Sequence, residues 1–117
     1  MAGTLTAVTR ENFRDLVASG TVLVDVWGPD CQPCIAMMPD VERLEAELED
    51  LTVIALEAPT ARRLCMELRV MGLPAFLLFR DGEEIGRLAG PDVTASALVD
   101  WLDGAMSGPE SKSEEQK

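Results

Sequence analysis

Two cysteines, Cys31 and Cys34, stand two residues apart in the stretch WGPDCQPC, with Gln32 and Pro33 between them. Thiols at this spacing can bind a metal ion, form a structural link, or cycle between a dithiol and a disulfide. A structural zinc site typically takes about four ligands, and the chain offers no histidine and one further cysteine. The pattern therefore favours a reversible dithiol over a metal site or a chance pair of inert thiols.

The pair lies between a predicted strand and a predicted helix. Residues 21–27 (TVLVDVW) are apolar and rich in β-branched residues, which is typical of a strand buried on both faces. From about residue 34 to 49 apolar residues recur at helical spacing, and Pro39 interrupts this helix. Because a helix N-terminus favours a thiolate, Cys31 is predicted to be the nucleophile. Cys34, one turn further on, is predicted to be the more buried, resolving thiol.

The chain has 117 residues, of which 47% are hydrophobic, and this suits one folded globular domain. Its net charge is −11, from 21 acidic and 10 basic residues, which argues against binding to nucleic acid or to an anionic membrane. No apolar run is long enough to span a membrane, and the N-terminus does not resemble a signal peptide. We therefore expect a cytoplasmic protein, where a CxxC pair is more often reactive than a permanent disulfide. We also expect a monomer.

The remaining elements follow from periodicity and turn residues. Asp81-Gly82 is a strong type I′ turn signal, and Thr94 can cap the last helix. The expected elements besides those above are strands at 4–8, 51–56, 75–80 and 83–89, and helices within 9–20, 59–70 and 94–106. The order β-α-β-α-β-α-β-β-α predicts an α/β fold, in which a central mixed β-sheet is flanked by helices on both faces.

Two parts of the chain differ in composition. Residues 1–106 carry all the predicted elements and form the expected domain. Residues 107–117 (SGPESKSEEQK) are polar and contain Pro, Gly and Ser, so they are predicted to be a disordered tail.

The sequence resembles the thioredoxin family over roughly residues 4–105. The resemblance rests on VLVDVWGPDCQPC, on Pro39 within the following helix, and on MGLPAFLLFRDGEEIGRLAG with its late glycine. It implies the thioredoxin fold and the activity of a protein-disulfide reductase, whose Cys31–Cys34 pair alternates between dithiol and disulfide. It also implies that no cofactor is bound, that the substrates are disulfide-containing proteins, and that an NADPH-linked thioredoxin reductase supplies electrons.

The resemblance also implies roles for individual residues. Cys31 matches the attacking cysteine, Cys34 the resolving one, and Asp25 the buried acid beneath the resolving thiol. An acid inside an apolar strand should be desolvated and have a raised pKa, so Asp25 could relay the proton that Cys34 loses. The alternative is that Asp25 points outward. Pro74 matches the family's cis-proline. The predicted substrate-binding residues are Trp27, Gln32, Pro33, Gly72, Leu73 and Pro74.

Three residues depart from the common family pattern. Asp30 stands where tryptophan is commonest, and its carboxylate beside Cys31 disfavours the thiolate. Gln32 replaces a glycine, and Ala55 stands where many members carry a lysine near the buried acid. These departures leave two alternatives open, namely a partner-specific oxidant or isomerase and a non-catalytic binding module or chaperone. The third cysteine, Cys65, is predicted to be a buried hydrophobe on its helix.

Overall fold

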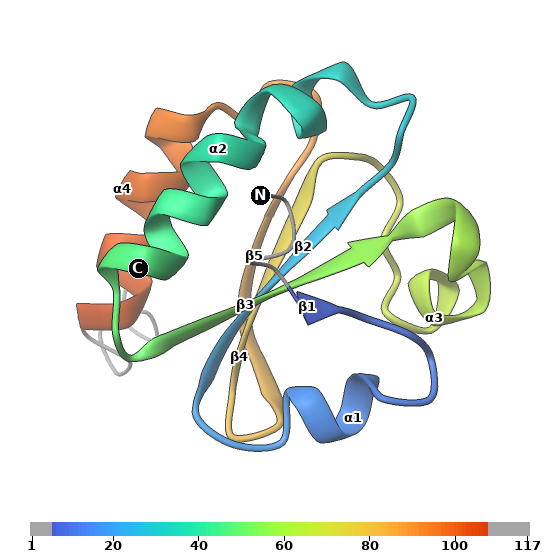
Figure 1. Ribbon diagram of the computed structural model, residues 1–117, viewed down its shortest axis with the longest axis horizontal. Coiled ribbons are helices and arrows are strands. Elements are labelled where there is room, and N and C mark those ends of the chain that lie inside the picture. Colours follow the sequence, from blue (N-terminus) through green and yellow to red (C-terminus); the bar gives the residue numbers. More distant parts are fainter. Residues whose placement is uncertain (1–5, 108–117) are drawn as a thin grey trace, which may run out of the picture.

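The computed structural model describes residues 6–107, which form one five-stranded sheet with helices on both faces (Figure 1). The strand order is β1-β3-β2-β4-β5. The strands are β1 Thr6–Ala7, β2 Thr21–Trp27, β3 Leu51–Glu57, β4 Ala75–Arg80 and β5 Glu83–Ala89. The helices are α1 Phe13–Leu16, α2 Gln32–Glu47, the short 3-10 helix η2 Ala58–Thr60, α3 Arg62–Glu67 and α4 Ala95–Ser107.

The sheet is mixed, as predicted, because β2 has one parallel and one antiparallel neighbour. Strand β3 runs parallel to β2 and to β1, whereas β4 pairs antiparallel with both β2 and β5. Strand β2 is therefore hydrogen-bonded along both edges, and its five central residues are buried. This explains why its sequence is an apolar run, broken by Asp25, and not an alternating pattern.

The two faces of the sheet carry separate core layers. Side chains alternate along a strand, so Val22, Val24 and Val26 pack in the layer beneath α1 and α3. Leu23 packs in the opposite layer, with residues of α2 and α4. Figure 1 shows the same division, with α2 and α4 lying together on one face of the sheet and α3 on the other. Even-numbered residues in the middle of β2 therefore face α1 and α3, and odd-numbered ones face α2 and α4.

Several sequence-based predictions are confirmed at residue level. The element order is the predicted one, with η2 added before α3, and strands 21–27, 75–80 and 83–89 have the predicted bounds. Asp81 and Gly82 have φ values of 52° and 90°, which is the left-handed pair that a type I′ turn requires. The hairpin also contains an irregularity between Leu78 and Phe79, which the sequence did not reveal.

The helix bounds differ from the predictions. Helix α2 begins at Gln32, two residues earlier than expected, because Cys31 serves as its N-cap and Pro33 is tolerated in the first turn. Pro39 lies inside this helix, which runs to Glu47. Helix α1 is a single short turn, Phe13–Leu16. Before it, the backbone N–H of Asn12 donates to the Thr9 hydroxyl at 3.2 Å and the backbone N–H of Thr9 donates to Asn12 Oδ1 at 2.8 Å, so Thr9 caps this turn.

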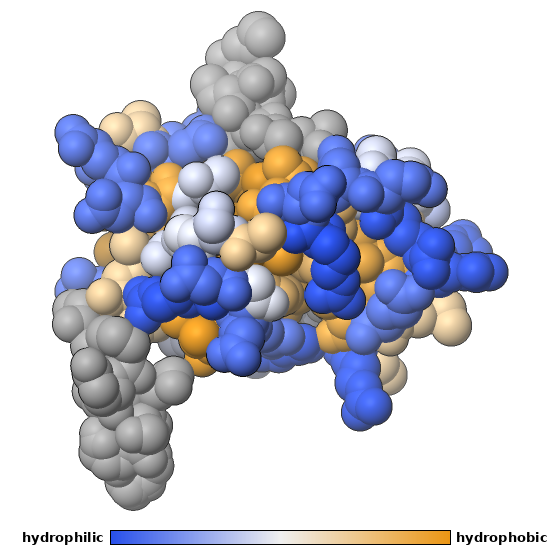
Figure 2. Space-filling model, turned by 90° about the horizontal axis from the view of Figure 1, so that it is seen from below, coloured by the Kyte–Doolittle hydropathy of each residue, from blue (hydrophilic) through white to orange (hydrophobic). Residues whose placement is uncertain are grey.

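Some predictions fall wholly or partly outside the described residues. The expected strand at 4–8 is seen as Thr6–Ala7, and residues 4 and 5 are not among those described. Of the expected tail, 107–117, Ser107 ends α4 and the others lie outside the described range. No helix within residues 6–107 is long and apolar enough to cross a membrane. In Figure 2, hydrophilic residues cover much of the face seen from below, with hydrophobic areas between them.

The start of α4 provides a test of the helix assignment. The backbone N–H of Ala97 donates to the Thr94 hydroxyl at 3.1 Å, as expected of an N-cap. Thr94→Ala should lower the free energy of unfolding by about 1 kcal/mol, because it removes the acceptor for this N–H. Urea denaturation measures the change. Thr94→Ser retains a hydroxyl and should remain within a few tenths of a kcal/mol of the parent; equal losses in both variants would argue against capping.

Candidate active site

Cys31 and Cys34 form a disulfide at the carboxyl end of β2, where the chain turns into α2. Their Cα atoms are 5.3 Å apart, within the ordinary range for a disulfide. Cys31 is the N-cap of α2, and its sulfur accepts a hydrogen bond from the backbone N–H of Cys34 at 3.2 Å. This N–H and the dipole of the 16-residue helix would stabilise negative charge on the Cys31 sulfur after reduction.

The two cysteines differ in exposure. Cys34 is 2% exposed and lies on the same buried stripe of α2 as Met37, Val41 and Leu44. Cys31 is half-buried, and the intervening Gln32 and Pro33 are exposed. Of the two residues, Cys31 is therefore the more accessible, whereas Cys34 is largely covered by the domain.

Asp25 is 2% exposed, and no other charged side chain is as buried among the residues whose burial the structure describes. On β2 it has the same parity as Leu23, so its side chain faces the α2 layer. In the sheet it pairs with Ala55 and Phe76. Desolvation by burial raises the pKa of Asp25 from 3.8 to about 7. The alternative in which Asp25 points outward is wrong.

Ala55 confirms what the sequence suggested about the surroundings of this acid. Because Ala55 is the β3 neighbour of Asp25, the residue beside the acid on that strand is apolar and uncharged. Desolvation is accordingly the cause of the raised pKa of Asp25, and no cationic group of the described residues opposes it. The acid is therefore able to exchange a proton near neutral pH.

The loop before β4 lies beside the disulfide-bearing end of β2. The Leu73–Pro74 peptide bond is cis, as the resemblance implied. Val26 pairs with Ala75, so the antiparallel register places Pro74 across from Trp27. The Pro74 carbonyl accepts a hydrogen bond from Gly90 N–H at 3.0 Å. Trp27 and Pro74, which are far apart in the sequence, are thereby brought to the same end of the sheet.

Gly28 is a site residue that the sequence reasoning missed. A Cβ atom at Gly28 would lie 3.3 Å from Leu73 Cδ1 and 3.7 Å from Pro59 Cδ. The absence of a side chain thus lets the cis-proline loop and η2 pack against the chain directly before the cysteines. The sequence showed a glycine between Trp27 and Pro29, but it could not show that Leu73 and Pro59 pack against this glycine.

The segments beside the cysteines and before the cis-proline carry exposed apolar and acidic side chains. Met71, directly before Gly72, is 94% exposed, and Ile35, directly after Cys34, is 43% exposed. Leu73 is half-buried. Asp30, directly before Cys31, is exposed. Asp30 and Ile35 thus flank the cysteine pair in the sequence, and Met71 is exposed in the segment that leads to the cis-proline.

Cys65 belongs to a different part of the molecule. It is 8% exposed and packs in the core layer beneath α1 and α3, as its predicted role as a buried hydrophobe required. Desolvation by burial raises the pKa of its thiol, which makes it less reactive. Within residues 6–107 no group of three or more His, Cys, Asp or Glu side chains is placed to hold a metal ion.

The sequence model of the thioredoxin family matches residues 4–104 of this chain. The chain belongs to the thioredoxin family. It is 38% identical over 90 residues to a thioredoxin of Acetoanaerobium sticklandii, covering 74% of this chain and 86% of that protein. It is 39% identical over 83 residues to a thioredoxin of Chlamydia muridarum, covering 71% and 81% respectively.

Solved structures confirm the thioredoxin fold. Oxidised mitochondrial thioredoxin 3 from Saccharomyces cerevisiae superposes with a TM-score of 0.79 and 23% sequence identity, over 88% of this chain and 97% of that one. The family membership and the CxxC pair held as a disulfide together identify this protein as a thiol–disulfide oxidoreductase that reduces protein disulfides.

Because Asp25 is buried, we expect the stability of the folded protein to depend on pH. Between pH 4 and 7 the folded protein retains a proton that the unfolded chain has lost, so the stability falls as the pH rises. Replacement by a neutral residue removes this cost. Oxidised Asp25→Asn should gain stability over the parent progressively from pH 4 to 8, by up to about 4 kcal/mol at the upper end.

Urea denaturation of the oxidised proteins across this pH range measures the effect. Asp100→Asn, which removes an exposed carboxylate from α4, is the matched control and should follow the parent curve. Parallel curves for the parent and Asp25→Asn would show that Asp25 titrates at an ordinary value.

Proposed function

We propose that Cys31 is the attacking thiol and Cys34 the resolving thiol in the reduction of substrate disulfides. The Cys31 thiolate attacks one sulfur of the substrate disulfide, which forms a mixed disulfide and releases the other substrate sulfur as a thiolate. The Cys34 thiolate then attacks the Cys31 sulfur, which frees the second substrate thiol. The protein leaves with the Cys31–Cys34 disulfide, and the substrate has gained two electrons and two protons.

The difference in exposure between the two sulfurs carries this assignment. Cys31 is half-buried at the N-cap of α2, whereas Cys34 is 2% exposed. An incoming protein can reach only the first without rearrangement of the domain. The hydrogen bond from Cys34 N–H to the Cys31 sulfur also favours the thiolate at the exposed position.

Asp25 is proposed to accept the proton that Cys34 must lose before it attacks the mixed disulfide. Asp25 faces the α2 layer, to which the buried stripe containing Cys34 also belongs. A pKa of about 7 means that Asp25 can accept a proton at neutral pH and release it afterwards. Proton transfer inside the domain would avoid exposing Cys34 to solvent during resolution.

The substrate is proposed to bind in an extended form across the end of the sheet. The binding surface consists of Trp27, Gln32, Pro33, Gly72, Leu73 and Pro74. Support comes from the register that sets Pro74 across from Trp27 and from the packing of Leu73 against Gly28. These contacts join the cysteine loop to the cis-proline loop.

An NADPH-linked thioredoxin reductase is the proposed electron donor, and the protein itself is proposed to bind no cofactor. One relative supports the pairing, a bifunctional thioredoxin reductase/thioredoxin of Mycobacterium leprae, 33% identical over 105 residues. The match covers 87% of this chain and 23% of that protein. We propose that the chain works as a cytoplasmic monomer.

Serine variants test the assignment of the two sulfurs. Cys31→Ser should lose insulin-disulfide reduction with dithiothreitol to the background rate, because the remaining thiol of the pair, Cys34, is buried. Cys34→Ser should instead accumulate a mixed disulfide with the substrate, visible by mass spectrometry. Cys65→Ala is the control and should keep near-parental activity. Accumulation of the mixed disulfide by Cys31→Ser, and not by Cys34→Ser, would reverse the roles.

A partner-specific oxidant or isomerase is the second candidate, because Asp30 and Gln32 depart from the common family motif. The reduction potential of the Cys31–Cys34 couple distinguishes the two. Thioredoxin is known to lie near about −270 mV and protein disulfide isomerase near about −180 mV. A value within about 30 mV of the first supports the reductant, and a value near the second supports the alternative. If the double variant Cys31→Ser/Cys34→Ser kept the protein's function, the protein would instead be a non-catalytic binding module.

Asp30 itself gives a further prediction. Its carboxylate, one residue from Cys31, should disfavour the thiolate through like-charge repulsion. Reduced Asp30→Asn should react with iodoacetamide at pH 7 faster than the parent, by roughly twofold to fivefold. The effect should shrink at high salt, because the carboxylate is exposed. Asp100→Asn is the matched control, and an equal rise in both variants would assign the effect to overall charge.

A further inference from the structure

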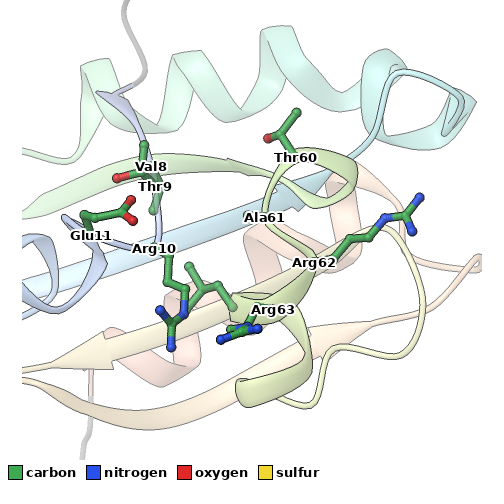
Figure 3. A pocket seen from close by; sticks show the side chains of 9 residues that line it. Val8, Thr9, Arg10, Glu11, Thr60, Ala61, Arg62 and Arg63 are labelled. Carbon is green, nitrogen blue, oxygen red and sulfur yellow. The ribbon is translucent and has the colours of Figure 1, made fainter.

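A pocket of about 370 Å³ lies on the α3 side of the sheet, away from the mechanism described above (Figure 3). Two segments about fifty residues apart in the sequence form it, namely the residues before α1 and the start of α3. The lining residues are Val8, Thr9, Arg10, Glu11, Thr60, Ala61, Arg62, Arg63 and Leu64. We call this the arginine pocket. Its size is within the range of pockets that hold small groups or side chains.

The arginine pocket is a locally cationic part of an acidic protein. The chain carries a net charge of −11, yet three arginines and one glutamate line this pocket. Of the three, Arg10 is held by Glu67 at 2.9 Å. Arg62 and Arg63 are exposed and make no ion pair or hydrogen bond with another described residue. Their guanidinium donors are available to an anionic group.

The pKa of Glu67, the partner of Arg10, is affected by the positive charge on this side of the molecule. The hydrogen bond from Arg10 is the main cause that lowers the pKa of Glu67, and the nearby charges of Arg10, Arg14 and Arg63 add to it, against a contribution from desolvation. In Figure 3 the side chains of Arg10 and Arg63 extend to the same side of the pocket. Glu67 therefore lies near the charges of Arg10, Arg14 and Arg63, whereas the side chain of Arg62 points away from Arg10 and Arg63 in Figure 3.

The arginine pocket also adjoins the active-site loop. Thr60 and Ala61 follow directly on Pro59, whose ring lies 3.7 Å from the Cβ position of Gly28, three residues before Cys31. A partner bound over η2 would thus lie beside the segment that carries the reactive sulfur.

An exposed methionine on α3, close to Arg62, favours a protein as the partner. Met66 is 75% exposed and lies one helical turn after Arg62, on the same face of α3. Exposed methionine and arginine are enriched where proteins bind one another. A small free anion would bind the guanidinium groups but would make no apolar contact with Met66.

We propose that the arginine pocket receives carboxylate side chains of the disulfide-bearing protein that is reduced at Cys31–Cys34. This inference rests on the proposed function. Arg62 and Arg63 bind the carboxylates, Met66 contacts an apolar neighbour, and the substrate disulfide is thereby presented to Cys31. The protein then prefers substrates with acidic residues near their disulfide, and the preference is set mainly in the rate of association.

Synthetic peptides with one intramolecular disulfide test the preference. In one set a Glu-Glu pair is moved stepwise away from the disulfide, and in the matched set Gln-Gln takes its place. Single-turnover rate constants are measured with the reduced protein. At the favoured separation the Glu-Glu peptide should react roughly tenfold faster at low salt than its counterpart, and the preference should fall as salt is raised.

Variants assign the preference to the pocket. Arg62→Ser/Arg63→Ser should lose it while the rates with Gln-Gln peptides stay at the parental value, and each single variant should lose part of it. Arg43→Ser is the matched control, since it removes an exposed arginine from α2, and it should keep the preference. Thermal unfolding of the variants checks that each is folded.

The remaining outcomes overturn the inference in distinguishable ways. If Gln-Gln peptides are reduced and Glu-Glu gives no advantage at any separation, the docking inference fails and the proposed function stands. Binding of pyrophosphate at Arg62 and Arg63 without any peptide preference would make this a small-anion site instead. If Arg62→Ser/Arg63→Ser keeps the preference for Glu-Glu peptides, residues outside the arginine pocket cause that preference, and the inference fails. If no peptide is reduced, the proposed function fails and the inference fails with it.

Discussion

The structure depends on β2 being hydrogen-bonded along both edges and covered on both faces. Its pairing with β3 and β4 holds the chain rigid up to Trp27, so the cysteine loop leaves the sheet from a fixed point. The same burial removes water from Asp25 and raises its pKa to about 7. One packing constraint thus both positions the disulfide and prepares an acid that can exchange protons near neutral pH.

The proposed mechanism rests on a contrast between the two sulfurs of the cysteine pair. The start of α2 leaves Cys31 half-buried at the N-cap, and one turn of helix carries Cys34 into the core. Dithiol exchange requires such a contrast, because the substrate must meet one sulfur while the other waits protected from solvent. In the proposed mechanism, the Asp30 carboxylate acts against the stabilising effect of the helix terminus on a Cys31 thiolate.

Sequence reasoning worked best where the signals are local. The apolar run at 21–27 and the Asp81-Gly82 turn located their strands to the residue, because side-chain alternation and left-handed turn positions involve near neighbours only. It worked less well at helix ends. The start of α2 depends on the capping by Cys31, which the periodicity of apolar residues does not reveal.

The sequence by itself determined the order of the main elements and the position of the cysteine pair between strand and helix, whereas the structure decided that Asp25 faces inward. Only the tertiary structure decided which distant segments meet. It set Pro74 across from Trp27, packed Leu73 and Pro59 against Gly28, and joined Arg10 to Arg62 and Arg63 around one pocket. The physical reason is that such contacts depend on strand register and side-chain packing between segments tens of residues apart, which no local pattern of residues specifies.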